Sequence, residues 1–377
     1  MLEHPMLEHP RLGHLRFPVE SSRGRRYPEP GHPYRNAFQR DRDRIIHTRA
    51  FRRLENKTQV FAPAVSDHFR NRLTHTIEVS QIARTVANAL GLNEDLTEAL
   101  ALVHDVGHPP FAHAGEEALN RRMQRFGERF DHNIQALRIV ESLEQRYPRF
   151  PGLNLTFEVR EGIVKHSRDF APGELPELDE YLPGLRPPLE AQLIDLADEV
   201  AYNAADLDDA YEAGLLAPAQ VAAAVPAYAD LLDTIETQFP GANERERFQE
   251  SVRHLIDDQV SGFIGGTVDA VNAAGVKDFE SVRHHASRLA RLTPEVRQTS
   301  LQLKRFLLAN VYSSEALEQD RRESIAKLDR VFEYLLEHPQ RMPGAEPPDP
   351  PHRAVCNFIA GMTDRYFLRF YNKLFGP

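Results

Sequence analysis

The chain lacks the features that distinguish secreted and membrane proteins. Cys356 is its single cysteine in 377 residues, which excludes a disulfide framework within the chain and favours a reducing compartment. No apolar run approaches the length that crosses a bilayer, and the first residues do not show the basic-then-apolar pattern of a signal peptide. We therefore expect a cytoplasmic protein with no membrane partner.

Strand patterns are also scarce. Segments in which apolar and polar residues alternate are nearly absent, and residues 153–159 are the best candidate for a short strand. No glycine-rich phosphate loop is found, because residues 262–266 have no preceding strand and no lysine. Apolar residues instead recur at helical spacing, for example Leu301, Phe306 and Leu307. The sequence predicts an all-α fold with room for one short β-hairpin.

The charge is negative overall but unevenly distributed. A formal net charge of −10 disfavours broad nucleic-acid binding. The first 60 residues are nevertheless rich in arginine, with Arg23, Arg25, Arg26, Arg35, Arg40, Arg42 and Arg44. These side chains could bind the phosphates of a substrate, of an effector nucleotide or of single-stranded nucleic acid.

Proline positions and changes in periodicity divide the chain into three parts. Residues 1–32 contain several prolines and no periodicity, and are predicted to form a flexible N-terminal arm. Residues 33–214 hold the most distinctive motifs and are predicted to form the core. Residues 215–377 are predicted to form a helical C-terminal extension, interrupted by a proline-rich loop at 343–351.

The adjacent residues His104 and Asp105 form the most informative motif. Residues 93–106 are predicted to form a helix with Asn93 as its N-cap, and the glycine and prolines that follow prevent its continuation. The pair therefore lies at the C-terminal end of the helix. A carboxylate there opposes the helix dipole, which favours a cation nearby.

Two other predicted helices could complete a metal site. His75 lies near the start of an amphipathic helix at 72–90, and Asp198 lies within a helix at 190–214. A lone histidine is more often a core residue, and acids spaced by four can form a solvated face. The second helix is mostly apolar, however, and buried acids need partners. Two imidazoles and two carboxylates would suit Mn, Fe, Zn or Mg.

Several blocks of sequence match the motifs of one enzyme family in order. They are RDRDRIIH (40–47), AFRRL (50–54), KTQVF (57–61), RLTH (72–75), HDVGHPPFAHAGE (104–116), DHNIQ (131–135), EGIVKH (161–166), ADEVAY (197–202) and LKRFL (303–307). The chain resembles the HD-domain phosphohydrolases, and within them the deoxyguanosine-triphosphatase-like dNTP triphosphohydrolases. Asp131 is a mild departure, because relatives usually have glutamate there.

This resemblance implies a role for each matching residue. The metal ligands would be His75, His104, Asp105 and Asp198, and the catalytic pair would be His113 and Glu116. Substrate contacts would come from Arg72 at the α-phosphate, Tyr202 and Asp206 at the sugar 3′-hydroxyl, Gln59 near the nucleoside, and Lys165 and His166 at phosphate. Arg53, with Arg52 and Lys57, is a candidate for the outer phosphates, with a solvated helix face as the alternative.

Hydrolysis at phosphorus needs a nucleophilic water, a positive environment and an acid for the leaving oxygen. His113 is suited to protonate the 5′-oxygen, and Glu116, three residues on, would share its helical face and orient the imidazole. The resemblance implies attack at the α-phosphorus, giving deoxynucleoside and inorganic triphosphate and thereby controlling dNTP pools. It also implies a divalent metal (Mn or Mg, with Fe, Co and Ni as further options), a homo-oligomer and an effector dNTP between subunits.

Two other functions remain open. One is an HD nucleotidase or phosphodiesterase that acts on a different substrate. The other is a nucleotide-sensing or nucleic-acid-binding regulator on the same scaffold. The intact set of four ligands together with His113 and Glu116 argues against the regulator, because a protein without catalysis need not keep them.

Overall fold

The structure is a computed structural model, and it describes residues 12–60, 69–342 and 349–376. These residues are predominantly helical, which confirms the predicted all-α class. The α-helices are α1 (Ala37–Ile46), α2 (Arg49–Arg53), α3 (Arg72–Leu90), α4 (Glu94–Val103), α5 (Ala112–Gln124), α6 (His132–Arg138), α7 (Phe157–Val164), α8 (Leu189–Glu212), α9 (Pro218–Ala224), α10 (Pro226–Gln238), α11 (Glu244–Ala274), α12 (Phe279–Arg283), α13 (Pro294–Leu307), α14 (Glu315–Glu337), α15 (Pro351–Ala360) and α16 (Asp364–Phe375).

The short strand expected at residues 153–159 is wrong. Among the described residues pairing is limited to isolated bridges, one of them between Arg25 and Thr156, and α7 begins at Phe157. The bridge does not extend into a strand because the chain turns into α7 at Phe157. The Asp41 carboxylate also holds this segment, since its Oδ2 accepts hydrogen bonds from the Thr156 backbone N–H at 2.9 Å and from the Thr156 hydroxyl at 2.6 Å.

The helices that position the predicted site begin and end for local reasons. The Asn71 side chain caps α3 by accepting from the Thr74 N–H, and Gly91 ends the helix with a φ of 78°. The Asn93 side chain caps α4 by accepting from the Leu96 N–H. The N-cap predicted from the sequence is therefore confirmed, and His104 is the C-cap of α4.

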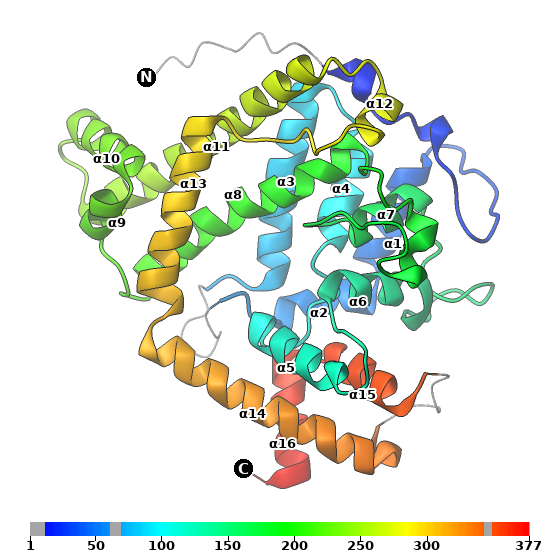
Figure 1. The fold of residues 1–377 in the computed structure, drawn as a ribbon. Helices are drawn as coiled ribbons and strands as arrows, with labels where there is room; N and C mark the ends of the chain where they lie inside the picture. Colours follow the sequence, from blue (N-terminus) through cyan, green and yellow to red (C-terminus); the bar gives the residue numbers. More distant parts are fainter. Residues whose placement is uncertain (1–11, 61–68, 343–348, 377) are drawn as a thin grey trace.

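The apolar core has three parts. The first joins α1, α3, α4, α7 and α8 to α11 and α12 of the C-terminal half, with α3 packed against both α4 and α8. The second joins the C-terminal half of α8 to α9, α10, α11 and α13. The third joins α5 to α14, α15 and α16, which lie together at one end of the molecule (Figure 1). Helices from the C-terminal half contribute to all three parts, so the two halves of the chain fold against each other.

The N-terminal segment packs against the first core instead of extending freely. Leu12, Leu15 and Phe17 are buried, and the Phe17 N–H donates to Glu190 Oε1 at 2.9 Å. The described part of the expected flexible arm, residues 12–32, is thus anchored, because its apolar side chains fill the core beside α3 and α4. In the part of the chain that the structure describes, no helix combines the length and apolar character needed to cross a membrane.

Candidate active site

A cavity of about 780 Å³ lies among α3, α5, α8, α13 and α14. It brings together most of the residues that the sequence singled out. Its lining includes Gln59, Arg72, His75, Asp105, His113, His166, Asp198, Tyr202 and Asp206. His104 and Glu116 lie directly behind this lining, where each contacts a residue that faces the cavity.

Ligand atoms for a metal ion converge at one wall of the cavity. Ring nitrogens of His75 and His104 and a carboxylate oxygen of Asp198 all lie within 4.8 Å of one another. His75 Nε2 is 2.8 Å from Asp198 Oδ1. His104 Nδ1 lies 2.6 Å from the Ala101 carbonyl oxygen, so it donates there and leaves Nε2 unprotonated. This Nε2 is buried and has no hydrogen-bond partner among the described residues, so the set fits a divalent ion.

Asp105 lies beside this group and is held by two cationic or polar neighbours. Its Oδ2 accepts from Arg72 Nη1 at 2.8 Å, and its Oδ1 is 2.9 Å from His108 Nδ1 and 3.6 Å from His104 Nε2. Burial acts to raise the pKa of Asp105, but Arg72, His108 and His104 together outweigh it and lower the pKa well below its usual value. The carboxylate at the C-terminal end of α4 therefore has a built-in counter-charge in Arg72.

The catalytic pair expected from the sequence has a different hydrogen-bond partner. His113 and Glu116 both lie on α5, as their spacing requires, and His113 faces the cavity. Glu116 Oε1, however, accepts from the His132 N–H at 3.1 Å and lies 3.0 Å from His132 Nδ1. Glu116 therefore contacts His132 at the start of α6. Burial lowers the pKa of His113, but the negative charge of Glu116 acts to raise it, so the expected role of Glu116 in holding the His113 imidazole charged or oriented stays a prediction.

The protonation states around α5 follow from these contacts. Burial acts to raise the pKa of Glu116, but the hydrogen bonds from His132 outweigh it and lower the pKa to about 2. Restricted solvation and the Arg72 charge lower the pKa of His113. The His132 ring stacks on His108, with ring centroids 3.9 Å apart. We assigned no role to His108 or His132 from the sequence, although both lie within the quoted motifs.

Farther along α8 from Asp198, the cavity wall is built from this helix and the end of α13. Asp206 accepts a hydrogen bond from the Tyr312 hydroxyl, and burial raises the pKa of Asp206 to about 7. Tyr312 ends the π-helical segment Leu308–Tyr312, an irregularity that is common at functional sites. Lys304 Nζ lies 5.4 Å from the centre of the Tyr202 ring and donates to the Glu199 carboxylate at 2.6 Å. Tyr312 and Lys304 are cavity residues that sequence reasoning missed.

Four basic side chains proposed for phosphate, Arg52, Arg53, Lys57 and Lys165, do not line the cavity. Arg52 is exposed on α2, and the other three bind backbone carbonyls. Arg53 Nη1 donates to the Gly361 carbonyl at 2.6 Å, and Lys57 Nζ donates to the carbonyls of His108 and Ala360. Lys165 Nζ binds Glu161 Oε1 at 2.8 Å and two backbone carbonyls. These three side chains support loops, because each is turned toward carbonyl oxygens of neighbouring segments.

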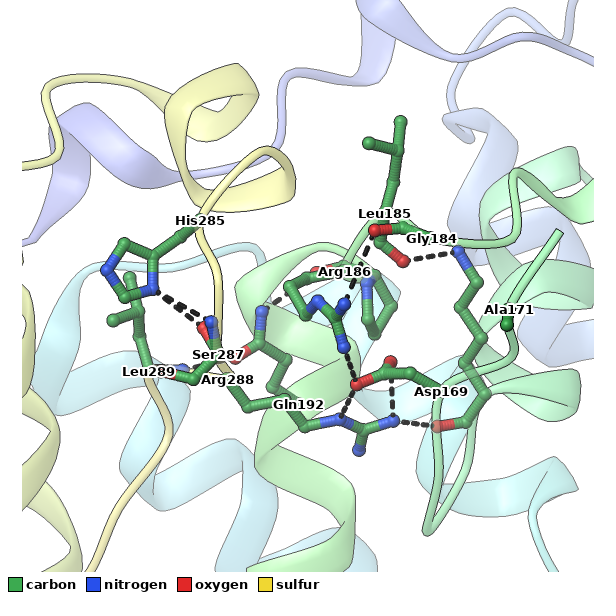
Figure 2. Close-up of polar contacts among 12 residues, drawn as sticks. Asp169, Ala171, Gly184, Leu185, Arg186, Gln192, His285, Ser287, Arg288 and Leu289 are labelled. Atoms are coloured by element: carbon green, nitrogen blue, oxygen red, sulfur yellow. Dashed lines mark hydrogen bonds and ion pairs between the residues drawn. The ribbon is translucent and has the colours of Figure 1, made fainter.

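His166 does face the cavity, and an ion network holds it from behind. Its Nδ1 is 2.7 Å from Asp195 Oδ1, and its ring centroid is 5.4 Å from that of His104. Arg288 donates both to Asp195 and to Asp169. Figure 2 shows Arg288 and Arg186 converging on Asp169, which fastens the segment after α12 to the loop after α7.

Most of the N-terminal arginines that could have bound phosphate are paired within the chain. Ion pairs with carboxylates involve Arg25, Arg26, Arg35, Arg40, Arg42 and Arg44. Arg23 lies over the Phe157 ring at 5.0 Å. Their charge is thus largely balanced by neighbouring acids in the folded protein.

Comparison with known proteins agrees with this geometry. The HD domain model matches residues 72–203, and the phosphohydrolase-associated domain model matches residues 290–373. Proteins named deoxyguanosinetriphosphate triphosphohydrolase-like protein are 44% identical in Geobacter sulfurreducens, over 94% of this chain and 93% of the relative, and 44% identical in Ralstonia nicotianae, over 94% and 92%. A relative of the same name in Brucella anthropi is also 44% identical, over 94% and 93%. The chain therefore belongs to the deoxyguanosinetriphosphate triphosphohydrolase-like family of HD-domain proteins.

Proposed function

We propose that this protein hydrolyses dNTPs at the α-phosphorus and releases a deoxynucleoside and inorganic triphosphate. The observation that carries the proposal is the convergence, in one cavity, of the His75, His104 and Asp198 group with Arg72 and His113. The names of the relatives point to the same class of reaction. Control of dNTP pools would follow from this activity.

The metal-binding residues fit a divalent ion, with Mn or Mg as the proposed identity. A metal held by His75, His104, Asp105 and Asp198 would lower the pKa of a bound water and withdraw charge from the phosphoryl oxygens. The protein's own contribution begins with Arg72. Its Nη1 is engaged by Asp105, while its Nε is buried without a hydrogen-bond partner among the described residues. That N–H is available for an α-phosphate oxygen.

We assign the proton transfer to His113. The imidazole faces the cavity, and its pKa is lowered in the free protein by restricted solvation and by Arg72. A bound triphosphate adds negative charge, which favours the protonated imidazole when substrate is present. The charged form can then give its proton to the departing 5′-oxygen. Glu116 acts through His132, which it holds at the same wall of the cavity.

The sugar would be bound farther along α8 from Asp198. Asp206 and Tyr312 form a hydrogen-bonded pair there, and Tyr202 lies one helical turn before Asp206 on α8. Buried hydroxyl and carboxyl groups of this kind discriminate strongly between substrates that can and cannot pair with them. We propose that this group binds the 3′-hydroxyl, with Gln59 nearer the nucleoside.

A product assay tests the proposal. Purified protein with Mn or Mg would be given each dNTP singly and as a mixture, and the nucleoside and phosphate products would be separated by chromatography. Deoxynucleoside and intact triphosphate are expected, and activity restricted to the mixture would indicate an effector dNTP. Stepwise loss of single phosphates would assign the chain to another HD chemistry, and no turnover with either metal would favour the regulator. Gel filtration of the same sample tests the proposed homo-oligomer.

A further inference from the structure

The loop that leads into the helix carrying His113 has an unfavourable backbone. Phe111 has a φ of 64° and Ala112 a φ of 51°, so two consecutive residues other than glycine adopt the left-handed conformation. Side chains with a Cβ rarely occupy this region, and such residues persist only where the surroundings fix them. His113 follows directly, so whatever fixes this loop also fixes the imidazole.

The carboxylate of Asp364, near the C-terminal end of the sequence, accepts hydrogen bonds that hold this loop in place. Asp364 Oδ1 accepts from the Phe111 N–H at 3.0 Å, and its Oδ2 accepts from the Thr58 N–H at 2.8 Å. Asp364 is 9% exposed, so water competes little for these bonds. Thr58 and Phe111 both line the cavity, and one side chain therefore joins two separate segments of its wall.

The turn that holds Asp364 is itself tied to the active-site segments. Arg53 Nη1 donates to the Gly361 carbonyl at 2.6 Å. The buried Lys57 ammonium donates to the carbonyls of both His108 and Ala360. The Phe111 and Phe367 rings also pack edge to face, with centroids 5.1 Å apart. These contacts hold the turn between α15 and α16 against the loop before α5. Helix α5 lies beside α15 and α16 (Figure 1).

We propose that Asp364 is a positioning residue of the active site, which holds the left-handed loop at Phe111 and so sets the place of His113. This inference rests on the proposed function, in which His113 transfers the proton. It assigns a specific task to the C-terminal helices: they supply the acceptor that the catalytic loop needs.

The first test is Asp364→Ala in the full-length protein. Loss of the acceptor should release the loop and lower kcat by about tenfold or more, because displacement of a reacting group by about 1 Å can cost up to about 10²-fold. KM for the dNTP should change less, since Arg72, Tyr202 and Asp206 keep their own supports. Hydrogen–deuterium exchange of a peptide covering residues 105–112 should become faster at the same time.

Two further variants separate positioning from general stability. Arg353→Ala breaks the ion pair with Glu128, which also fastens α15 to the rest of the protein but does not touch the loop. It should lower the melting temperature while kcat stays within about twofold. Ala112→Gly, placed in the Asp364→Ala background, should recover several-fold in kcat because glycine adopts a positive φ without support. The same glycine in the wild-type background should give no gain.

Asp364→Asn gives a milder change in case the alanine variant fails to fold. Its single acceptor oxygen can serve only one of the two N–H groups, so an intermediate kcat is expected. Unchanged kcat and unchanged exchange in both Asp364 variants would overturn the proposal, as would equal kcat losses in Asp364→Ala and Arg353→Ala. The exchange result does not depend on turnover. If the wild-type protein hydrolyses no dNTP, but exchange in residues 105–112 is still faster in the Asp364 variants than in the wild type, the proposed function is refuted. The assignment of Asp364 to the loop then still stands.

Discussion

At the scale of single residues, the cavity's histidines differ in what their ring nitrogens contact. His104 donates through Nδ1 to a carbonyl and keeps Nε2 free, which is the arrangement of a metal ligand. His132 is held by a carboxylate instead, and His113 faces the open cavity. The surroundings of these imidazoles therefore differ, and the roles that we propose for His104 and His113 rest on this difference.

Substitution of two of these histidines should separate metal binding from proton transfer. His113→Ala should lower turnover by about 10²–10⁴-fold, the range for loss of a general acid, while metal content stays at the wild-type level. His104→Ala should lose both turnover and bound metal. Metal per chain measured by inductively coupled plasma mass spectrometry, beside turnover of the same samples, checks this. Loss of metal in His113→Ala would show that a ligand has been mistaken for the acid.

Lys57 should make stability depend on pH in the alkaline range. Burial, aided by the Arg72 charge, lowers the pKa of Lys57 from 10.5 to about 7. Between these values the unfolded chain binds more protons than the folded one, so the free energy of unfolding should rise with pH, by up to roughly 1.4 kcal/mol per pH unit. Lys57→Met should abolish this rise in urea titrations at pH 7, 8 and 9. The partly exposed Lys327→Met serves as the control, and parallel slopes for wild type and Lys57→Met would contradict the assignment.

At the scale of helices, α8 carries its functional groups at intervals of one turn. Asp198 faces the metal ligands, and Tyr202 and Asp206 continue along the same wall toward Tyr312. A helix that is otherwise buried keeps these polar groups because each has a partner or lines the cavity. Under the proposed function, residues one turn apart on α8 would contact successive parts of the substrate.

The proposed role of Tyr202 and Asp206 can be tested by comparison with a residue of α8 that does not line the cavity. Tyr202→Ala and Asp206→Ala should each lower kcat/KM for a dNTP by about tenfold or more, which corresponds to roughly 1.4 kcal/mol of transition-state stabilisation. Asp208→Ala is the matched control, because Asp208 pairs with Arg70 and Gln249 outside the cavity. Equal effects at positions 206 and 208 would remove the sugar-binding interpretation.

Helices could be predicted because they depend on short-range patterns, whereas the four proposed metal ligands come from three separate segments and were expected from the resemblance to a known family. The cap at Asn93 and the period of apolar residues predict α3, α4 and α8 closely. The contacts of Glu116, Lys57 and Lys165 could not be predicted, because their partners come from loops and helices that only the tertiary fold brings near. Sequence spacing shows which residues share a face of a helix. It does not show which residues from other segments form hydrogen bonds with them in the folded protein.

At the scale of the whole molecule, the cavity joins parts of the chain that are far apart in sequence. The proposed metal ligands come from α3, from the C-terminal end of α4 and from α8, while Lys304, Leu308 and Tyr312 come from the C-terminal half. A metal that bridges three helices of the first core should therefore contribute to global stability.

Removal of the metal should lower the melting temperature. A ligand at 100 times its Kd stabilises the folded state by about 2.7 kcal/mol, which corresponds to a shift of several degrees for a chain of this size. Differential scanning calorimetry before and after EDTA, and again after addition of Mn, measures the effect. His75→Ala should melt at the same temperature in all three conditions. A wild-type protein equally indifferent to EDTA would exclude a bridging metal.

The division of the core into three parts has a mechanical consequence. The residues proposed as metal ligands lie on or beside helices of the first core, whereas α5, with His113 and Glu116, is seated in the third core among α14, α15 and α16. Besides the loop before α5, the contacts of Glu116 with His132 and of Asp364 with Thr58 join these two parts. Under the proposed function, a molecule that moved the third core relative to the first would change the rate of proton transfer while the four proposed metal ligands kept their positions.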